Sequence, residues 1–168
     1  MHHVWHRAPW AYCLVATIAF AAWSLITPAS AEDGGKWLGR AALVITNEKI
    51  VKVADAADHE VSMTEFDGVV FSEGEKPFLD NARYQVVSLF DTGGLVGGGY
   101  KTFTAEDGSK VIAEFKGTGG TWPTFKGEWS FVGGTDKFKG ISGHGIYTIT
   151  FTSNTTAWDL LEGDYKIP

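Results

Sequence analysis

The chain has 168 residues and a formal net charge of −6 at pH 7, a length that suits a single domain. The acidic balance argues against a nucleic-acid-binding protein, because phosphates require a cationic face, and against adhesion to anionic lipid. The one cysteine, Cys13, excludes a disulfide bond within the chain. Stability therefore has to come from packing.

The first 31 residues have the three-part pattern of a secretory signal peptide. Met1–Arg7 carries one Arg and no acidic residue, Ala11–Ile26 is almost entirely apolar, and Ala29–Ala31 ends in the small residues that a signal peptidase accepts. An uncleaved anchor is the alternative, but the apolar run is shorter than the roughly 20 residues that span a bilayer. We expect cleavage after Ala31, a secreted or periplasmic location, and no membrane contact afterwards.

The expected mature domain, residues 32–168, carries 13 basic and 20 acidic residues, a net charge of −7, and no cysteine. Its many glycines separate short runs that are rich in Val, Ile, Phe, Tyr, Trp and Thr, which is typical of strands and turns. No long segment has a 3.6-residue period, so helices should be few. In chain order, the predicted strands are 40–46, 49–54, 60–72, 83–91, 100–105, 110–115, 125–132, 145–152 and 163–167.

Turn residues connect these predicted strands. Asn47-Glu48 predicts the first turn, and residues 54–58 predict a loop or a single helical turn. The glycine-rich segments 93–99 and 117–123 predict loops. Asp107-Gly108 predicts a type I′ hairpin turn, which requires positive φ at both central residues.

A chain of eight or nine hairpin-linked strands must close its sheet or pair two sheets. Closure removes the unpaired edge strands that promote aggregation. We therefore predict an all-β fold, a single eight-stranded antiparallel up-and-down β-barrel, with a β-sandwich as the alternative. An eight-stranded barrel has room for its own side chains or for one small ligand.

A resemblance supports the barrel. Segment 129–145, WSFVGGTDKFKGISGHG, resembles the Gly-Gly-Thr-Gly-(Lys/Arg)-Phe-x-Gly-x-x-Gly signature of allene oxide cyclase-like and dirigent-like barrels, with Asp136 where that pattern usually has Gly. Segments 66–71 and 91–103 also look like bacterial secreted members of the allene oxide cyclase-like group. Over residues 60–167, the resemblance implies an eight-stranded barrel with a central, mostly apolar cavity, and a homo-oligomer.

No metal or cofactor is expected from the residue pattern. The two histidines of the mature domain, His59 and His144, are 85 positions apart, whereas zinc ligands usually occur in closely spaced pairs. We expect both to be solvated turn residues. Ser142 lies two positions before His144, but no third residue that could orient a catalytic triad is evident.

Large rings at alternating strand positions are the best candidates for a ligand site. If Tyr84, Tyr100, Trp129 and Tyr147 line the barrel, they form an apolar cup with phenol and indole groups, a common composition for ligand pockets. The alternative is that these rings simply fill the core.

Two carboxylates, Glu65 and Asp67, share a strand face with Val69 and Phe71. If that face lined the cavity, either acid could transfer a proton, and Tyr100 or Tyr147 could stabilise charge. The alternative places both acids in solvent. We expect a secreted barrel that binds a small hydrophobic or aromatic molecule without catalysis. The alternative function is an allene oxide cyclase-like isomerase, or a dirigent-type protein that guides a reactive hydrophobic intermediate.

Overall fold

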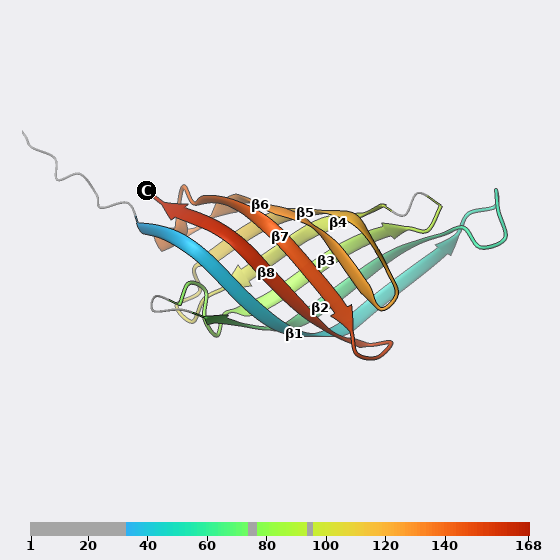
Figure 1. The fold of residues 1–168 in the computed structure, drawn as a ribbon, viewed down its shortest axis with the longest axis horizontal. Helices are drawn as coiled ribbons and strands as arrows, with labels where there is room; N and C mark the ends of the chain where they lie inside the picture. Colours follow the sequence, from blue (N-terminus) through green and yellow to red (C-terminus); the bar gives the residue numbers. More distant parts are fainter. Residues whose placement is uncertain (1–32, 74–76, 94–95) are drawn as a thin grey trace, which may run out of the picture.

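In a computed structural model, residues 33–73, 77–93 and 96–168 are described, and they form one closed antiparallel β-barrel (Figure 1). The strands are β1 Asp33–Lys52, β2 Glu60–Glu73, β3 Arg83–Asp91, β4 Val96–Thr104, β5 Lys110–Thr121, β6 Thr124–Gly134, β7 Ser142–Phe151 and β8 Thr156–Ile167. Each strand pairs with the next, and β8 pairs with β1, which closes the cylinder. The predicted all-β, eight-stranded up-and-down barrel is confirmed.

Between β6 and β7 lies a single turn of 3-10 helix, η1, Asp136–Phe138. Asp136 has a φ of 51°, so it adopts the left-handed conformation that glycine would adopt more readily. No helix among the described residues is long and apolar enough to cross a membrane. The predicted signal peptide and its cleavage site after Ala31 lie outside the described residues.

The predicted turn at Asn47-Glu48 is wrong. The two strands predicted on either side of it are parts of β1, which runs for 20 residues along β2. The register shifts between Ile45 and Asn47, which marks a β-bulge. A bulge bends a strand and leaves a residue unpaired without reversing the chain, so polar residues here do not form a turn.

The predicted hairpin at Asp107-Gly108 joins β4 to β5, but its turn is not type I′. Gly108 has a φ of 85°, and Asp107 is not among the residues with positive φ. The N–H of Gly108 donates to the carbonyl of Ala105, and the N–H of Ala105 donates to the carbonyl of Ser109. This pattern is a three-residue hairpin loop with glycine in the left-handed position.

Strands also extend further than their hydrophobic runs predict. The glycines at 97–99 belong to β4, residues 117–121 belong to β5, and β8 begins at Thr156 rather than near residue 163. Segment 54–58 forms turns rather than helix. Glycine-rich segments were predicted as loops because glycine disfavours strands, but backbone pairing around the closed barrel overrides that preference.

Figure 1 shows that β1 begins and β8 ends at the same end of the barrel. Buried aromatic side chains pack together at this end. We call Trp37, Phe78, Phe103, Trp129 and Phe131 the aromatic cluster. The Trp37 ring lies 5.4 Å, 5.4 Å and 5.5 Å from the rings of Phe78, Phe103 and Trp129, in edge-on geometry. This geometry places the positive ring edge against a negative ring face, so the cluster closes this end of the barrel.

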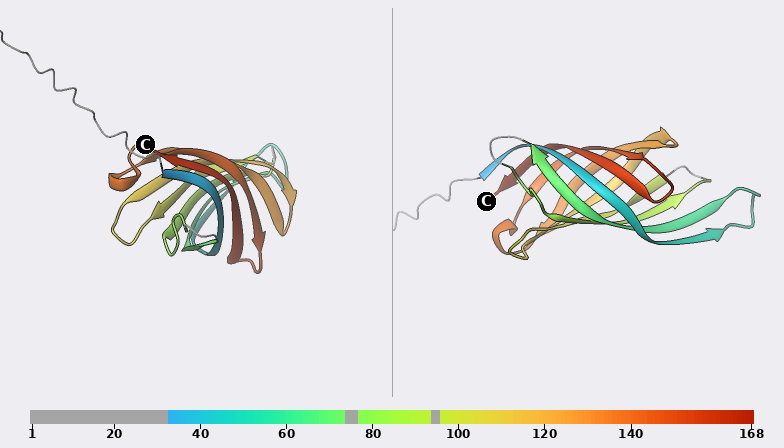
Figure 2. Two further views of the ribbon diagram at one scale, coloured as in Figure 1. Left: turned by 60° about the vertical axis from the view of Figure 1, so that its left-hand side comes forward. Right: turned by 90° about the horizontal axis from the view of Figure 1, so that it is seen from below.

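Two glycines make room for the Trp129 indole within this cluster. Gly145 on β7 and Gly163 on β8 face each other across the strand pair. A Cβ atom at either position would lie 2.6 Å from Cζ2 of Trp129. Larger residues at these positions would therefore displace the indole. At the opposite end of the barrel, the β1–β2 hairpin projects beyond the other turns (Figure 2).

Candidate functional site

A cavity of about 320 Å³ occupies the barrel at the end opposite the aromatic cluster. Exposed residues near the strand ends, Glu48, Trp122 and Asn154, lie at its rim, so it opens to solvent there. The Trp122 ring stacks on Phe151 at 4.9 Å. Its apolar wall comprises Ile45, Phe66, Val86, Phe90, Phe115, Phe125, Tyr147, Ile149 and Phe151.

A buried polar group lies between the cavity and the aromatic cluster. Nζ of Lys101 lies 2.6 Å from Oδ2 of Asp159 and 2.7 Å from the Tyr84 hydroxyl, and that hydroxyl lies 2.7 Å from the same Oδ2. We call these three residues the floor triad. Lys101 and Asp159 line the cavity, and the Tyr84 ring stacks on Phe103 of the aromatic cluster at 4.7 Å.

Topology brings the floor triad together from distant strands. Tyr84 is on β3, Lys101 on β4 and Asp159 on β8, and β4 and β8 lie on opposite sides of the closed strand order. The side chains of Lys101 and Asp159 are 3% and 0% exposed. Such burial of an ion pair is tolerated only when both charges are well hydrogen-bonded.

The environment determines the protonation of the floor triad. Burial lowers the pKa of Lys101, whereas the neighbouring charge of Asp159 acts in the opposite direction. Burial and the charge of Asp159 raise the pKa of Tyr84 well above its usual value. The Tyr84 hydroxyl therefore stays protonated and donates to Oδ2 of Asp159. The Lys101 ammonium donates to the Tyr84 hydroxyl oxygen and to the same Oδ2.

Two aromatic rings flank the Lys101 ammonium on the cavity side. Nζ lies 4.3 Å from the ring centroid of Tyr147 and 4.9 Å from that of Phe115. A ring face attracts a cation through its quadrupole, more strongly where water is excluded. Burial, and then the charge of Asp159, also raise the pKa of Tyr147, so this phenol remains neutral beside the triad.

One atom of the floor triad is unsatisfied. Oδ1 of Asp159 is buried and has no hydrogen-bond partner in the described part of the chain. Leaving a buried acceptor without a partner costs on the order of 1–3 kcal/mol. Asp159 is among the residues that line the cavity. The site therefore combines an apolar wall with a buried carboxylate that has one hydrogen-bond acceptor without a partner among the described residues.

The structure separates the four predicted ring residues. Tyr84, Trp129 and Tyr147 lie inside the barrel, at 0%, 3% and 6% exposed, whereas Tyr100 is 56% exposed on the outer wall. Of the four, Tyr147 lines the cavity, Tyr84 belongs to its floor triad, and Trp129 belongs to the aromatic cluster. Tyr100 lines a separate hollow of about 720 Å³ on the outer wall, together with His144. Their roles in ligand binding remain predictions.

The two predicted carboxylates lie on the outer face of β2. Oδ2 of Asp67 lies 2.7 Å from Nη2 of Arg83, and the hydrogen bond from that guanidinium lowers the pKa of Asp67. Oε1 of Glu65 lies 3.4 Å from the Asn47 amide nitrogen. Neither carboxylate lines the cavity. Their location agrees with the alternative in which both acids face solvent.

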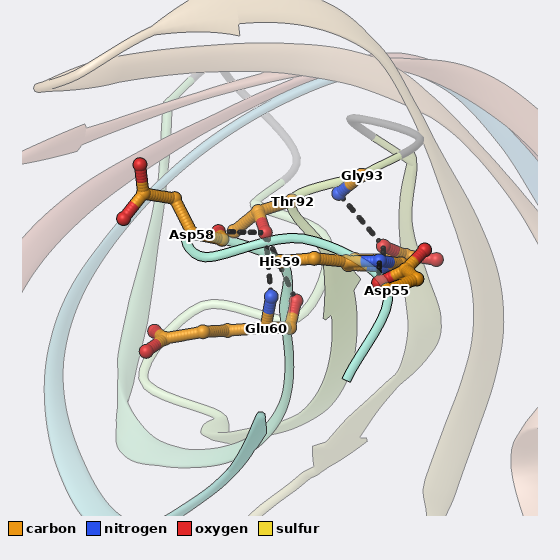
Figure 3. A network of polar contacts seen from close by, with 7 residues as sticks. Asp55, Asp58, His59, Glu60, Thr92 and Gly93 are labelled. Atoms are coloured by element: carbon orange, nitrogen blue, oxygen red, sulfur yellow. Dashed lines mark hydrogen bonds and ion pairs between the residues drawn. The ribbon is translucent and has the colours of Figure 1, made fainter. Parts of the chain in front are cut away.

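At the open end, His59 ties the β1–β2 loop to the end of β3 (Figure 3). Its Nδ1 lies 2.7 Å from Oδ1 of Asp55, and its Nε2 lies 2.7 Å from Oδ1 of Asp91. Because ionised carboxylates only accept hydrogen bonds, both contacts require a doubly protonated imidazolium. His59 is therefore not the solvated residue that the sequence predicts, and its side chain is 17% exposed.

Backbone bonds reinforce this tie between hairpins. The N–H of Thr92 donates to the Glu60 carbonyl at 3.0 Å, and Oγ1 of Thr92 accepts from the Glu60 N–H at 2.8 Å. The N–H of Gly93 donates to Oδ1 of Asp91 at 2.9 Å.

Among the described residues, no group of three or more His, Cys, Asp or Glu could hold a metal ion.

The floor triad leads to a stability prediction. Asp159→Asn leaves the Lys101 ammonium buried without a counter-charge, and losing one partner of such a pair costs about 3–5 kcal/mol. The double variant Lys101→Met/Asp159→Asn removes both charges and keeps an acceptor for Tyr84, so we expect it to recover most of that loss. Urea unfolding of the wild type, both single variants and the double variant measures the coupling. Additive losses would contradict a buried ion pair.

The His59 contacts lead to a pH prediction. The hydrogen bonds that the His59 ring donates to Asp55, the larger effect, and to Asp91 raise the pKa of His59 in the folded state. The stabilisation is therefore complete below the unfolded pKa of about 6.5, and it is lost as the pH rises through the folded pKa. We expect the melting temperature of the wild type to exceed that of His59→Phe most at low pH.

Circular dichroism melts across neutral pH provide the measurement. The charges of Asp58 and Glu60, which neighbour His59 in the chain, are the same in both proteins and cancel in the difference. A difference in melting temperature that stays constant with pH would mean that the imidazolium contacts do not form.

Comparisons with known proteins point to the same fold. No family model and no curated protein sequence matches the chain. Among solved structures, the pterocarpan synthase dirigent protein GePTS1 has a TM-score of 0.51 and 16% identity over 89% of this chain and 99% of that chain. The pterocarpan synthase dirigent protein PsPTS1 has a TM-score of 0.46 and 13% identity over 81% and 95%. The fold of this chain is a dirigent-like β-barrel.

Proposed function

We propose that the barrel binds one small hydrophobic or aromatic molecule in its cavity. The observation that carries this proposal is the unequal filling of the barrel. Aromatic side chains pack one end, whereas about 320 Å³ stays open at the other. Ligand pockets typically have volumes of about 300–1,000 Å³, apolar walls and a few polar groups. This cavity has that composition at the small end of the range.

A dirigent-type activity, guidance of a reactive hydrophobic intermediate, is the second candidate. The fold shared with GePTS1, whose structure is described as that of a pterocarpan synthase dirigent protein, favours it. Within this chain, the supporting observation is the floor triad, where Lys101, Tyr84 and Asp159 can hold or move a proton beside the cavity. An allene oxide cyclase-like isomerisation would need the same feature. Fold similarity by itself does not determine activity.

The proposal includes export of the protein. The support is the pattern of a basic start, an apolar run and small residues before the cleavage position after Ala31. Strand β1 begins at Asp33, close to the proposed new N-terminus. Such a protein would meet its ligand in the periplasm or outside the cell.

A cavity-filling variant tests ligand binding. Ser88 on β3 lines the cavity, so Ser88→Phe places a phenyl ring in the space that the ligand would occupy. Val87, the preceding residue, is 46% exposed on the outer wall. Val87→Phe therefore places the same phenyl ring outside the cavity. We expect Ser88→Phe to weaken binding of the neutral fluorescent probe N-phenyl-1-naphthylamine at least tenfold, and Val87→Phe to leave it unchanged.

Circular dichroism melts would show that both variants fold. If the wild type does not bind the probe, or if both variants weaken binding equally, the cavity is not a ligand site.

A further inference from the structure

We propose that two copies of this chain pair through an unpaired edge of β1, so that their projecting β1–β2 hairpins join into one antiparallel sheet with two-fold symmetry. The contact lies on the hairpins and is independent of the proposed ligand-binding function. The observations that carry the inference are the register of β1 with its two neighbours, the exposed apolar residues of the hairpin and the order of charges along its edge.

The two neighbours of β1 end at different places. On the β8 side, strand pairing stops at Val44, and the N–H of Ile45 makes one last bond to a carbonyl of the β7–β8 turn. On the β2 side, pairing continues to Lys52. Residues 46–52, which we call the β1 edge, therefore have a described strand on one side only, and all of them are exposed. Alternate N–H and C=O groups of such an edge point to solvent, where another strand can pair with them.

Apolar side chains of the β1 edge are exposed on both faces of the hairpin. Ile50 and Val51 are each 52% exposed, and neighbouring residues of a strand point to opposite faces. A two-stranded ribbon has no second layer that could cover them. A second hairpin beside the first covers part of both side chains, and the backbone ladder supplies directional bonds, as when a strand adds to a free sheet edge.

The order of charges along the β1 edge selects one register for the two copies. Directly opposite side chains point to the same face of a sheet, so a two-fold antiparallel pairing has to be centred on a single residue. Centring on Ile50 places each Glu48 opposite the partner's Lys52, and opposite charges across a strand pair are favourable. Centring on Glu48, Lys49 or Lys52 places like charges opposite each other. Centring on Val51 places Ile50 opposite a lysine.

This register brings the partner copy to the mouth of the cavity. Glu48 lines the cavity, and so does Ser62, which lies opposite Ile50 on β2. Glu48 and Ile50 therefore share the cavity-facing side of the hairpin, and the contact with the partner's Lys52 forms on that side.

The geometry also limits the size and strength of the assembly. A two-fold pairing uses each edge once and then closes, so it does not continue into a fibre. The edge is short compared with a stable interface, which buries roughly 1,600 Å². We therefore expect a weak dimer whose population rises with protein concentration.

Disulfide trapping tests the pairing on the full chain carrying Cys13→Ser, in which an introduced cysteine is the only thiol. Ile50→Cys places two thiols directly opposite each other, at a Cα separation that a disulfide can span. We expect mild oxidation to convert this variant to a covalent dimer at least tenfold faster than Val87→Cys, a similarly exposed position on the outer wall. Equal rates would overturn the inference.

Mixed cysteine variants in the same background test the register. Glu48→Cys chains should cross-link with Lys52→Cys chains faster than either variant cross-links with itself, because four residues along the strands separate identical positions. If either variant alone reacts as fast as the mixture, the register centred on Ile50 is refuted and the inference fails.

Exchange of charges tests the contact without cysteines, by sedimentation velocity. Glu48→Lys and Lys52→Glu each place like charges opposite each other, so we expect either alone to weaken the dimer at least tenfold. An equimolar mixture should recover wild-type association, because every pair in the mixed dimer then joins opposite charges. Glu114→Lys makes the same charge change on the outer wall of β5 and should leave association unchanged.

Circular dichroism melts would show that these variants fold. A wild-type protein that stays monomeric at millimolar concentration, or a dimer that neither Glu48→Lys nor Lys52→Glu weakens, would mean that the β1 edge does not pair with a second copy. Neither result would affect the cavity or the probe-binding test of its function.

Discussion

Two opposite charges, the Lys101 ammonium and the Asp159 carboxylate, meet inside the barrel from strands β4 and β8, which lie opposite each other in the closed strand order. Removing both charges from water costs several kcal/mol for each ion. The contact between them and the hydrogen bonds with Tyr84 offset that cost only if the barrel closes in this register. The ion pair therefore links the closure of the fold to the polarity of its cavity.

The same pair marks the boundary between two halves of the interior. On one side, Tyr84 stacks on Phe103 and joins the aromatic cluster, where glycines at 145 and 163 allow close packing of Trp129. On the other side, Tyr147 lines the cavity. Aromatic packing fills one half of the interior, and the floor triad places buried polar groups beside the cavity in the other half.

Period-two alternation predicted much of the barrel from the sequence, because it is set locally by side chains that point to alternate faces. It did not determine which face of each strand lines the interior, and the structure places Trp129 and Tyr147 on the inner faces of β6 and β7 and Tyr100 on the outer wall. It could not distinguish a bulge from a turn at Asn47, because both favour polar residues.

The floor triad was missed for a physical reason. Lys101 and Asp159 are 58 positions apart, and each looks like a solvent-facing residue until the register is known. The available signal was a charged residue at an inward position, as in Ala157-x-Asp159-x-Leu161, whose neighbours are buried. Glu65 and Asp67 were candidates for an inward position but lie on the outer face of β2. Exposed apolar residues such as Phe71 share that face and make it resemble a core face in the sequence.

The most direct test of this account is heteronuclear NMR of the protein with ¹⁵N-labelled lysine side chains. The account predicts one lysine ammonium signal with slow hydrogen exchange at neutral pH. That signal should disappear in Lys101→Met and shift when the hydrophobic probe N-phenyl-1-naphthylamine is added. If every lysine ammonium exchanges rapidly with solvent, or if the protected signal does not respond to any ligand, the buried ion pair is not the floor of a binding cavity.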